Sequence, residues 1–214
     1  VCGDGITRDD RLVAERGYEA CDDGDEDELD RCDNRCRVTI CGDVVTQTGA
    51  GEQCDDGNDD DQDDCLNDCQ SARCGDGVVR MDLALDAPDF ESCDDGNAVD
   101  DDACPNDCRA GPIALASGRN FSCFLLANGR VYCFGGNRYG QSRPGGEAYT
   151  VAPQMLPGLT DVVAIGADSY HTCALRASGN ALCWGYRHDG LEAVSHRVPW
   201  VDLAVGGDFV CGLD

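Results

Sequence analysis

Carboxylate and amide side chains gather at high density around three cysteine-rich loops of this chain. The clearest copy, residues 52–69, reads E-Q-C-D-D-G-N-D-D-D-Q-D-D-C-L-N-D-C. Like charges a few ångströms apart repel one another by about 1–4 kcal/mol per pair, so this density favours a bound cation. Calcium binds six to eight oxygen ligands, often in a loop that turns at a glycine. The stretch therefore predicts a calcium-binding loop.

The same arrangement occurs three times. The cysteine that precedes Asp-Asp-Gly is Cys21, Cys54 or Cys93, and in each copy two more cysteines follow after ten and then three further residues. Each copy also begins with Cys-Gly-Asp, at Cys2, Cys41 and Cys74. This repetition predicts three small units in a linear array, over residues 1–40, 41–73 and 74–111.

The candidate calcium ligands are the oxygen-bearing side chains that recur at equivalent positions in these repeats. They are Asp4, Glu19, Asp22, Asp23, Asp25, Asp30 and Asn34 in the first repeat, Asp43, Glu52, Asp55, Asp56, Asn58, Asp63 and Asn67 in the second, and Asp76, Glu91, Asp94, Asp95, Asn97, Asp102 and Asn106 in the third. No EF-hand frame fits any of the loops.

Zinc binding and plain solvation are the two alternatives to calcium for these loops. Structural zinc sites combine cysteine pairs with further cysteines or histidines, whereas the surroundings here supply hard oxygen ligands. Runs of charge are commonly just solvated surface. Solvation does not require Glu, Asp and Asn to recur position by position, so the pattern favours calcium.

Composition separates the chain into two parts. The net charge is −26, and nearly all of it lies in the first 111 residues, which places a boundary near Gly111-Pro112. A surface with this much negative charge repels nucleic-acid phosphates and anionic lipids. No apolar run approaches the ~20 residues of a membrane span. The 17 regularly spaced cysteines indicate an oxidising compartment, so we expect a secreted or cell-surface protein.

Covalent ties must stabilise the first part, because each repeat has too little apolar material for a core. Below about 40 residues, disulfides or metals normally supply the missing stability. Four cysteines per repeat permit three pairings, and the sequence does not choose among them. The linkers, residues 37–40 and 70–73, are so short that they favour a rigid rod.

These repeats resemble the myxobacterial cysteine-rich repeat, whose pattern is C-G-D-G, a variable stretch, E-x-C-D-D-G-N and then D-x-D-x-C-x3-C. The third copy matches closely, whereas the second has Val44 in place of the second glycine. The first copy departs most, with Asp25 for Asn and with Arg31 and Arg35 where the second copy has aspartates. The resemblance implies an extracellular spacer or adhesion module rather than a catalyst.

The second part alternates apolar residues with glycine-rich turns, which is typical of β-hairpins. If 127–129 and 177–179 are three-residue loops with a left-handed glycine, then Cys123 lies opposite Cys133 and Cys173 lies opposite Cys183. Opposed cysteines on neighbouring strands lie within disulfide reach, so we predict both disulfides.

These hairpins resemble the regulator-of-chromosome-condensation repeat, here G-x-x-x-S/T-C-x-L-x-x-x-G-x-x-x-C-W/F-G, which forms blades of a β-propeller. Residues 112–214 hold two copies and a partial third that begins at Val201 and leaves Cys211 as the odd cysteine. Either the chain is a fragment, or another molecule completes the blade in a head-to-tail contact, which generates open filaments when its rotation does not close. The resemblance does not carry guanine-nucleotide exchange with it.

The expected fold is thus a rod of small, irregular, disulfide-rich calcium-binding repeats followed by an all-β, incomplete propeller. No catalytic motif is present, so we expect a non-enzymatic structural protein that forms a surface fibre or stalk through end-to-end homo-oligomer contacts. The alternative is an adhesion module in which a Ca²⁺-loaded rod presents a propeller to a protein or glycan. A third interpretation is an accessory region of a large secreted hydrolase.

Overall fold

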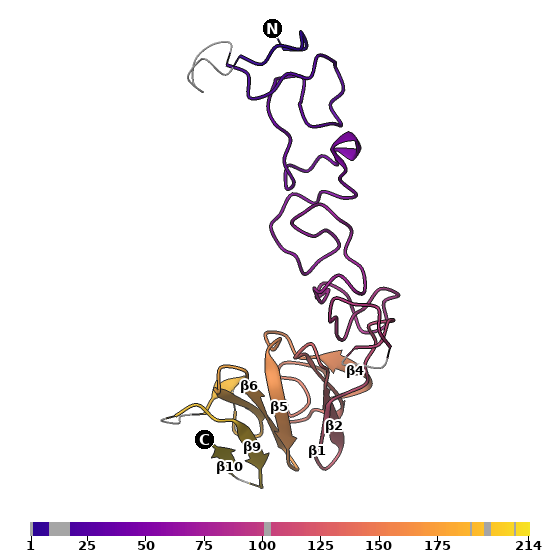
Figure 1. The fold of residues 1–214 in the computed structure, drawn as a ribbon. Helices are drawn as coiled ribbons and strands as arrows, with labels where there is room; N and C mark the ends of the chain where they lie inside the picture. Colours follow the sequence, from indigo (N-terminus) through magenta and orange to yellow (C-terminus); the bar gives the residue numbers. More distant parts are fainter. Residues whose placement is uncertain (1, 9–17, 101–103, 189, 195–197, 208) are drawn as a thin grey trace. The chain divides into compact units, whose positions relative to one another are not determined.

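The computed structural model describes residues 2–8, 18–100, 104–188, 190–194, 198–207 and 209–214. The chain divides into two compact units, Val1–Val99 and Asp100–Asp214, so the division falls inside the third repeat. Figure 1 shows both units.

Nested disulfides take the place of regular secondary structure in the first unit. Its described elements are one short 3-10 helix, η1 (Thr48–Ala50), and two isolated antiparallel bridges, Cys32 with Val38 and Cys65 with Ser71. In the first two repeats the first cysteine pairs with the fourth and the second with the third. The bonds are Cys2–Cys36, Cys21–Cys32, Cys41–Cys69 and Cys54–Cys65. Cys74, Cys93, Cys104 and Cys108 are disulfide-bonded as well.

Adjacent repeats of this unit are joined by the same backbone hydrogen bond. Gly49 N–H donates to the carbonyl of Leu29 at 2.7 Å, and Met81 N–H donates to the carbonyl of Gln62 at 2.6 Å. Leu29 and Gln62 occupy equivalent positions, each just before an aspartate of the acidic loop. Each acidic loop is therefore tied directly to the repeat that follows it.

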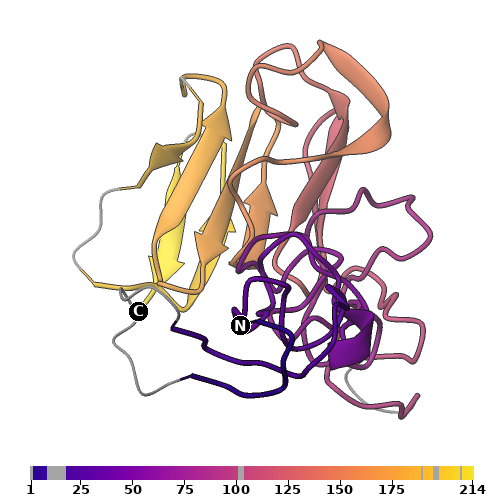
Figure 2. The same cartoon turned by 90° about the horizontal axis from the view of Figure 1, so that it is seen from above.

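The second unit is all-β and antiparallel (Figures 1 and 2). One four-stranded sheet contains β1 (Ala114–Ser117), β2 (Phe121–Leu125), β3 (Val131–Gly136) and β4 (Tyr149–Met155) in chain order. A second contains β5 (Val162–Ala167), β6 (His171–Arg176), β7 (Ala181–Gly185) and β8 (Glu192–Ala193). A two-stranded hairpin contains β9 (Asp202–Val205) and β10 (Val210–Leu213).

The central hairpin of each sheet has a cross-strand disulfide. Cys123 pairs in register with Cys133, and Cys173 with Cys183, and in both disulfides the Cα atoms are 4.1 Å apart. Gly129 and Gly179 close the loops with φ of +77° and +81°, a conformation that glycine adopts without strain. The core between the sheets is built from ten buried residues: Phe121, Cys123, Leu125, Val131, Cys133, Leu156, Leu159, Val162, Ala174 and Trp184.

The same two glycines connect each sheet to the next. The Gly129 carbonyl accepts a hydrogen bond from Val162 N–H at 3.1 Å, and the Gly179 carbonyl accepts one from Trp200 N–H at 3.0 Å. A Cβ atom on Gly129 would lie 2.5 Å from the Thr160 carbonyl oxygen, and one on Gly179 would lie 2.4 Å from Pro199 Cβ. The hairpin glycines thus permit the close contact between successive blades. Among the described residues, no helix is long and apolar enough to cross a membrane.

Val44 is a point of backbone strain in the second repeat. Its φ is +74°, whereas the equivalent residues of the other repeats, Gly5 and Gly77, are glycines with φ of +74° and +90°. For a β-branched residue this left-handed conformation is a genuine outlier and costs roughly 1–2 kcal/mol.

We expect Val44→Gly to raise the free energy of unfolding by about 1 kcal/mol, measured by denaturant titration. The control is Val45→Gly, where φ is not positive and glycine should destabilise; an equal or lower stability of Val44→Gly contradicts the prediction.

Candidate functional site

The predicted calcium ligands separate into two groups with different roles. The first group binds the backbone. In the second repeat, Asp55 Oδ2 accepts hydrogen bonds from Gly42 and Asp43 N–H at 2.9 and 3.1 Å, and its Oδ1 accepts one from Val44 N–H at 2.9 Å. Asp22 accepts Gly5 N–H at 2.8 Å, and Asp94 accepts Gly75 and Gly77 N–H at 2.6 and 2.8 Å. The Cys-Gly-Asp opening is thus a cradle of N–H groups for an aspartate of its own repeat.

These hydrogen bonds lower the pKa of Asp55. Burial by itself raises the pKa of a carboxyl group, but the hydrogen bonds from Val44, Asp43, Gly42 and Gly57 N–H outweigh it and lower the pKa of Asp55 below its ordinary value of 3.8. Asp55 therefore stays ionised to a lower pH than an aspartate in water.

The recurring glutamates have a similar structural role. Glu52 Oε2 accepts Gln47 N–H at 2.7 Å, and Glu91 Oε2 accepts Arg80 N–H at 2.8 Å. Glu19 instead binds the Arg8 guanidinium at 2.9 Å. Burial raises the pKa of Glu91, which is only 3% exposed. Each glutamate therefore fixes the variable stretch of its repeat.

The aspartates of the Cys-Gly-Asp opening close local turns. Asp4, Asp43 and Asp76 accept N–H groups two residues ahead, from Ile6, Val45 and Val78, at 3.2, 3.0 and 2.9 Å. Such side-chain turns are a common use of aspartate in loops. Most of the carboxylates in the first group therefore accept hydrogen bonds from backbone N–H groups.

The second group forms two clusters of carboxylates in the acidic loops. Asp23, Asp25 and Asp30 each offer one oxygen within 4.8 Å of the other two, and so do Asp56, Asp63 and Asp64. Calcium–oxygen distances of about 2.3–2.6 Å place two ligands of one ion at most about 5 Å apart, so both clusters fit calcium.

Two positions are common to both clusters, and the third differs. Asp23 is equivalent to Asp56, and Asp30 to Asp63. The second repeat has Asn58 where the first has Asp25, and the first has Arg31 where the second has Asp64. Asp64 is absent from the predicted ligands because it does not recur. The first two repeats therefore each supply three carboxylates, two from equivalent positions and one from a position that differs.

Crowding of carboxylates contributes to a raised pKa in the first cluster. Desolvation raises the pKa of Asp23, and the negative charges of Asp30 and Asp25 raise it further. In the second cluster burial also raises the pKa of Asp63, but hydrogen bonds from Asn58 Nδ2 and Cys65 N–H outweigh it and lower the pKa overall. The two clusters therefore shift the pKa of an aspartate in opposite directions.

The predicted asparagine ligands mostly hold the loops together. Asn58 and Asn97 accept the N–H of Asp60 and Val99, each at 2.7 Å. The amides of Asn34 and Asn67 donate to the carbonyls of Glu26 and Asp59 at 3.2 and 3.1 Å. The backbone N–H of Asn106 donates a hydrogen bond to Asp100 at 3.0 Å. Of the remaining predicted ligands, Asp95 is exposed and Asp102 lies outside the described residues.

The predicted calcium ligands omit one acidic position that recurs in all three repeats. Asp61 Oδ1 accepts Asn67 N–H at 2.6 Å, Asp100 Oδ1 accepts Asn106 N–H at 3.0 Å, and Glu28 Oε1 accepts the Asn34 amide at 2.8 Å. All three copies carry an acid there, so the internal alignment contained the signal. Its role is to anchor the asparagine that precedes the last cysteine.

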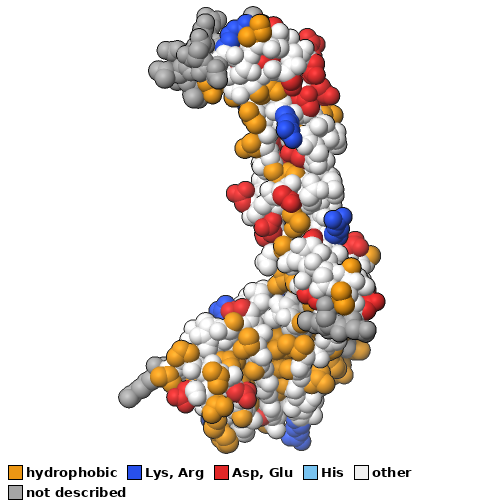
Figure 3. Space-filling model, in the orientation of Figure 1, with side chains coloured by type: hydrophobic (Ala, Val, Ile, Leu, Met, Phe, Trp, Pro, Cys, Tyr) orange, Lys and Arg blue, Asp and Glu red, His pale blue; other side chains and the backbone are white. Residues whose placement is uncertain are grey.

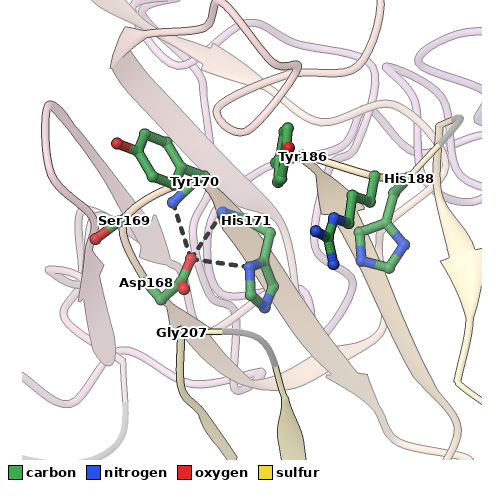
Figure 4. Close-up of a pocket in the computed structure, with 8 residues that line it drawn as sticks. Asp168, Ser169, Tyr170, His171, Tyr186, His188 and Gly207 are labelled. Atoms are coloured by element: carbon green, nitrogen blue, oxygen red, sulfur yellow. Dashed lines mark hydrogen bonds and ion pairs between the residues drawn. The ribbon is translucent and has the colours of Figure 1, made fainter.

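The second unit has a pocket of about 490 Å³ (Figure 4). Asp168 Oδ1 accepts hydrogen bonds from His171 Nδ1 and from the backbone N–H groups of Tyr170 and His171, each at 2.9 Å. On the other wall, His188 Nδ1 lies 3.0 Å from Glu192. The hydroxyl of Ser169 points away from His171 in Figure 4, so these residues do not form a Ser-His-Asp relay. A third histidine, His196, lies outside the described residues.

Two families match separate stretches of the chain. Residues 113–141 and 162–190 match the regulator of chromosome condensation (RCC1) repeat. Residues 33–70 match a domain of unknown function, DUF4215. The chain therefore contains RCC1-like propeller-type repeats after a disulfide-rich region.

Solved structures resemble part of the chain. Yeast RCC1 (Prp20), in a complex with Kap60, is 18% identical over 47% of this chain and 29% of that one, with a TM-score of 0.42. Human WBSCR16 is 18% identical over 60% of this chain and 35% of that one, also with a TM-score of 0.42. This chain thus spans about a third of the length of these proteins.

Removing the Asp55 carboxylate should destabilise the second repeat. We expect Asp55→Asn to lower the free energy of unfolding by about 1–3 kcal/mol, because it leaves backbone N–H groups unsatisfied. Since the folded-state pKa is depressed, the stabilisation by Asp55 exists above the ordinary pKa of 3.8 and is lost as pH falls through the folded value. The variant should therefore lose less stability than wild type in acid. Asp59→Asn, at an exposed loop position, is the control, and equal acid sensitivity of Asp55→Asn and wild type contradicts the prediction.

Proposed function

We propose that this chain is a calcium-binding extracellular structural protein, in which Ca²⁺ occupies the acidic loops of disulfide-tied repeats. The observation that carries the proposal is the pair of three-carboxylate clusters at equivalent places in two repeats. The raised pKa of Asp23 adds support, since a cation would offset both the desolvation and the repulsion from Asp30 and Asp25 that raise it.

The donor set favours calcium over zinc. Every described cysteine of the first unit is in a disulfide, so no thiolate is present there to bind a soft metal. The remaining donors are carboxylate, amide and carbonyl oxygens, which are calcium ligands. Loops built from irregular turns also suit the flexible coordination of calcium better than the strict octahedron of magnesium.

Calcium would stiffen the array because each cluster adjoins an inter-repeat hydrogen bond. Asp30 and Asp63 directly follow Leu29 and Gln62, whose carbonyls bind the next repeat. An ion that fixes these aspartates would hold the carbonyls in place. On this basis the repeats form a stiff rod, and the chain is a non-catalytic subunit of a surface fibre or stalk. The disulfides support an extracellular location.

A second function, binding of a protein or glycan by the blades, is favoured by one observation. RCC1-type repeats build the second unit, and it contains the pocket between Asp168 and His188. In this case the repeats would present the blades to a ligand.

Calcium titration tests the main proposal. We expect calcium to raise the melting temperature of wild type, because a ligand of the folded state adds RT ln(1 + [L]/Kd) to stability. The double variant Asp56→Asn/Asp63→Asn should lose one site and weaken the remaining calcium response, measured by calorimetric titration up to about 10 mM, since extracellular modules bind with Kd of about 0.1–1 mM. Asp59→Asn removes a loop charge outside the cluster and should keep all sites. Absence of both heat and stabilisation in wild type contradicts the proposal.

A further inference from the structure

Three tyrosines and three arginines form one exposed cluster in the second unit. We call it the tyrosine–arginine face, and its residues are Arg119, Arg138, Tyr139, Tyr170, Tyr186 and Arg187. The ring centroid of Tyr139 lies 5.4 Å from that of Tyr170 and 5.3 Å from that of Tyr186, and the centroids of Tyr170 and Tyr186 are 6.2 Å apart. Tyr139 and Tyr186 are 41% and 44% exposed, so these packed rings remain open to solvent.

Each arginine is held by a different tyrosine. Arg119 Nη1 donates to the Tyr170 hydroxyl at 3.0 Å, and the guanidinium groups of Arg138 and Arg187 lie over the rings of Tyr139 and Tyr186, 5.9 and 5.3 Å from the centroids. All three arginines are exposed. Within the part of the chain that the structure describes, none of them is paired with a carboxylate. The face therefore presents oriented, unneutralised cations.

Arg187 adopts a strained backbone conformation. Its φ is +70°, which costs a non-glycine residue roughly 1–2 kcal/mol. The equivalent residue of the first blade, Asn137, instead holds its own loop by accepting Ser142 and Arg143 N–H at 3.0 and 2.8 Å. The second blade has thus exchanged a loop-stabilising side chain for an exposed cation. Strain of this kind concentrates at functional sites.

The pocket of about 490 Å³ lies beside the face, because Tyr170, Tyr186 and Arg187 line both. Figure 4 shows Tyr186, His171 and His188 around the same space. Asp168, the acid of this pocket, is already bound to His171, and its side chain is 9% exposed. The more exposed groups of the pocket wall are accordingly Arg187, the His188 imidazole and the rings of Tyr170 and Tyr186, a setting that suits an entering carboxylate.

We propose that the tyrosine–arginine face binds the acidic repeats of a second copy of this chain. Charge complementarity identifies the partner: the net charge of −26 lies almost entirely in the first 111 residues, whose acidic surface is visible in Figure 3. Asp59, Asp60 and Asp68 are exposed and lie outside the carboxylate clusters, so they remain available for arginine. Arginine binds carboxylates bidentately, and tyrosine and arginine are enriched at the energetic centres of interfaces.

This contact deepens the proposed fibre and rests on that part of the proposed function, since it names the surface through which copies join. A face in the second unit that binds the acidic repeats of the next copy is a heterologous contact, which propagates into an open assembly unless its rotation closes a ring. Calcium in the loops is not required for it. Loss of the face should therefore abolish association without changing the calcium titration.

Sedimentation of the full chain tests the contact. We expect wild type to associate at about 50 mM salt and to weaken at about 500 mM, where exposed charges are screened. The triple variant Arg119→Gln/Arg138→Gln/Arg187→Gln should associate at least tenfold more weakly. The matched control, Arg31→Gln/Arg35→Gln/Arg73→Gln, changes the net charge equally but leaves the face intact, and should associate as wild type or better. A monomeric wild type, or a face variant that associates like wild type, overturns the proposal; in the latter case the fibre survives with another contact.

Cross-linking identifies the partner surface directly. The chain contains no lysine, so Arg187→Lys places one side-chain amine on the face. Carbodiimide joins amines to carboxylates in direct contact, and a mixture of isotope-labelled and unlabelled chains separates links between copies from links within one. We expect links between copies from position 187 to carboxylates of residues 18–99. Arg176→Lys, beside Asp161 at 2.7 Å, is the control that should link within its own chain. Links from position 187 only within one chain, or only to the blades, overturn the proposal.

Discussion

The first unit depends on carboxylates that bind backbone N–H groups. With almost no apolar core, its described residues are held by nested disulfides and by Asp22, Asp55 and Asp94, which fill the N–H cradle of their own repeats. This explains why two aspartates stand side by side after the cysteine. The first faces the backbone, and the second, Asp23 or Asp56, faces the acidic loop. A single sequence motif thus supplies both a structural anion and a candidate metal ligand.

Both units extend by the same device, a backbone hydrogen bond from each repeat to its successor. In the first unit the acceptors are the carbonyls of Leu29 and Gln62, and in the second they are those of Gly129 and Gly179. The second unit adds a shared apolar core around Trp184, and the described residues of the first unit form no such core. The proposed calcium ions would have the corresponding role in the first unit, because each would lie next to an inter-repeat bond. Repeat stability then depends on neighbours rather than on one large core.

The sequence was informative where geometry is local and repetitive. The loop lengths around Gly129 and Gly179 were sufficient to place Cys123 opposite Cys133 and Cys173 opposite Cys183, since hairpin register follows from loop length. The nested pairing of the first unit could not be chosen, because all three pairings suit the same spacing. Composition also could not distinguish a carboxylate that binds backbone N–H groups from one that lies beside other carboxylates in an acidic loop. Asp64 and Arg187 were not among the predicted site residues, because alignment of the repeats selects positions that recur and both residues depart from the repeat.

The central claim is that a cation binds among the carboxylates of the acidic loops. Anomalous-difference density from crystals grown with calcium tests it most directly, because only the ion and the sulfur atoms give strong signals. The account predicts a peak within about 2.6 Å of oxygens from Asp56, Asp63 and Asp64, and a second peak among Asp23, Asp25 and Asp30. Well-ordered loops with peaks at the sulfur atoms alone would contradict it.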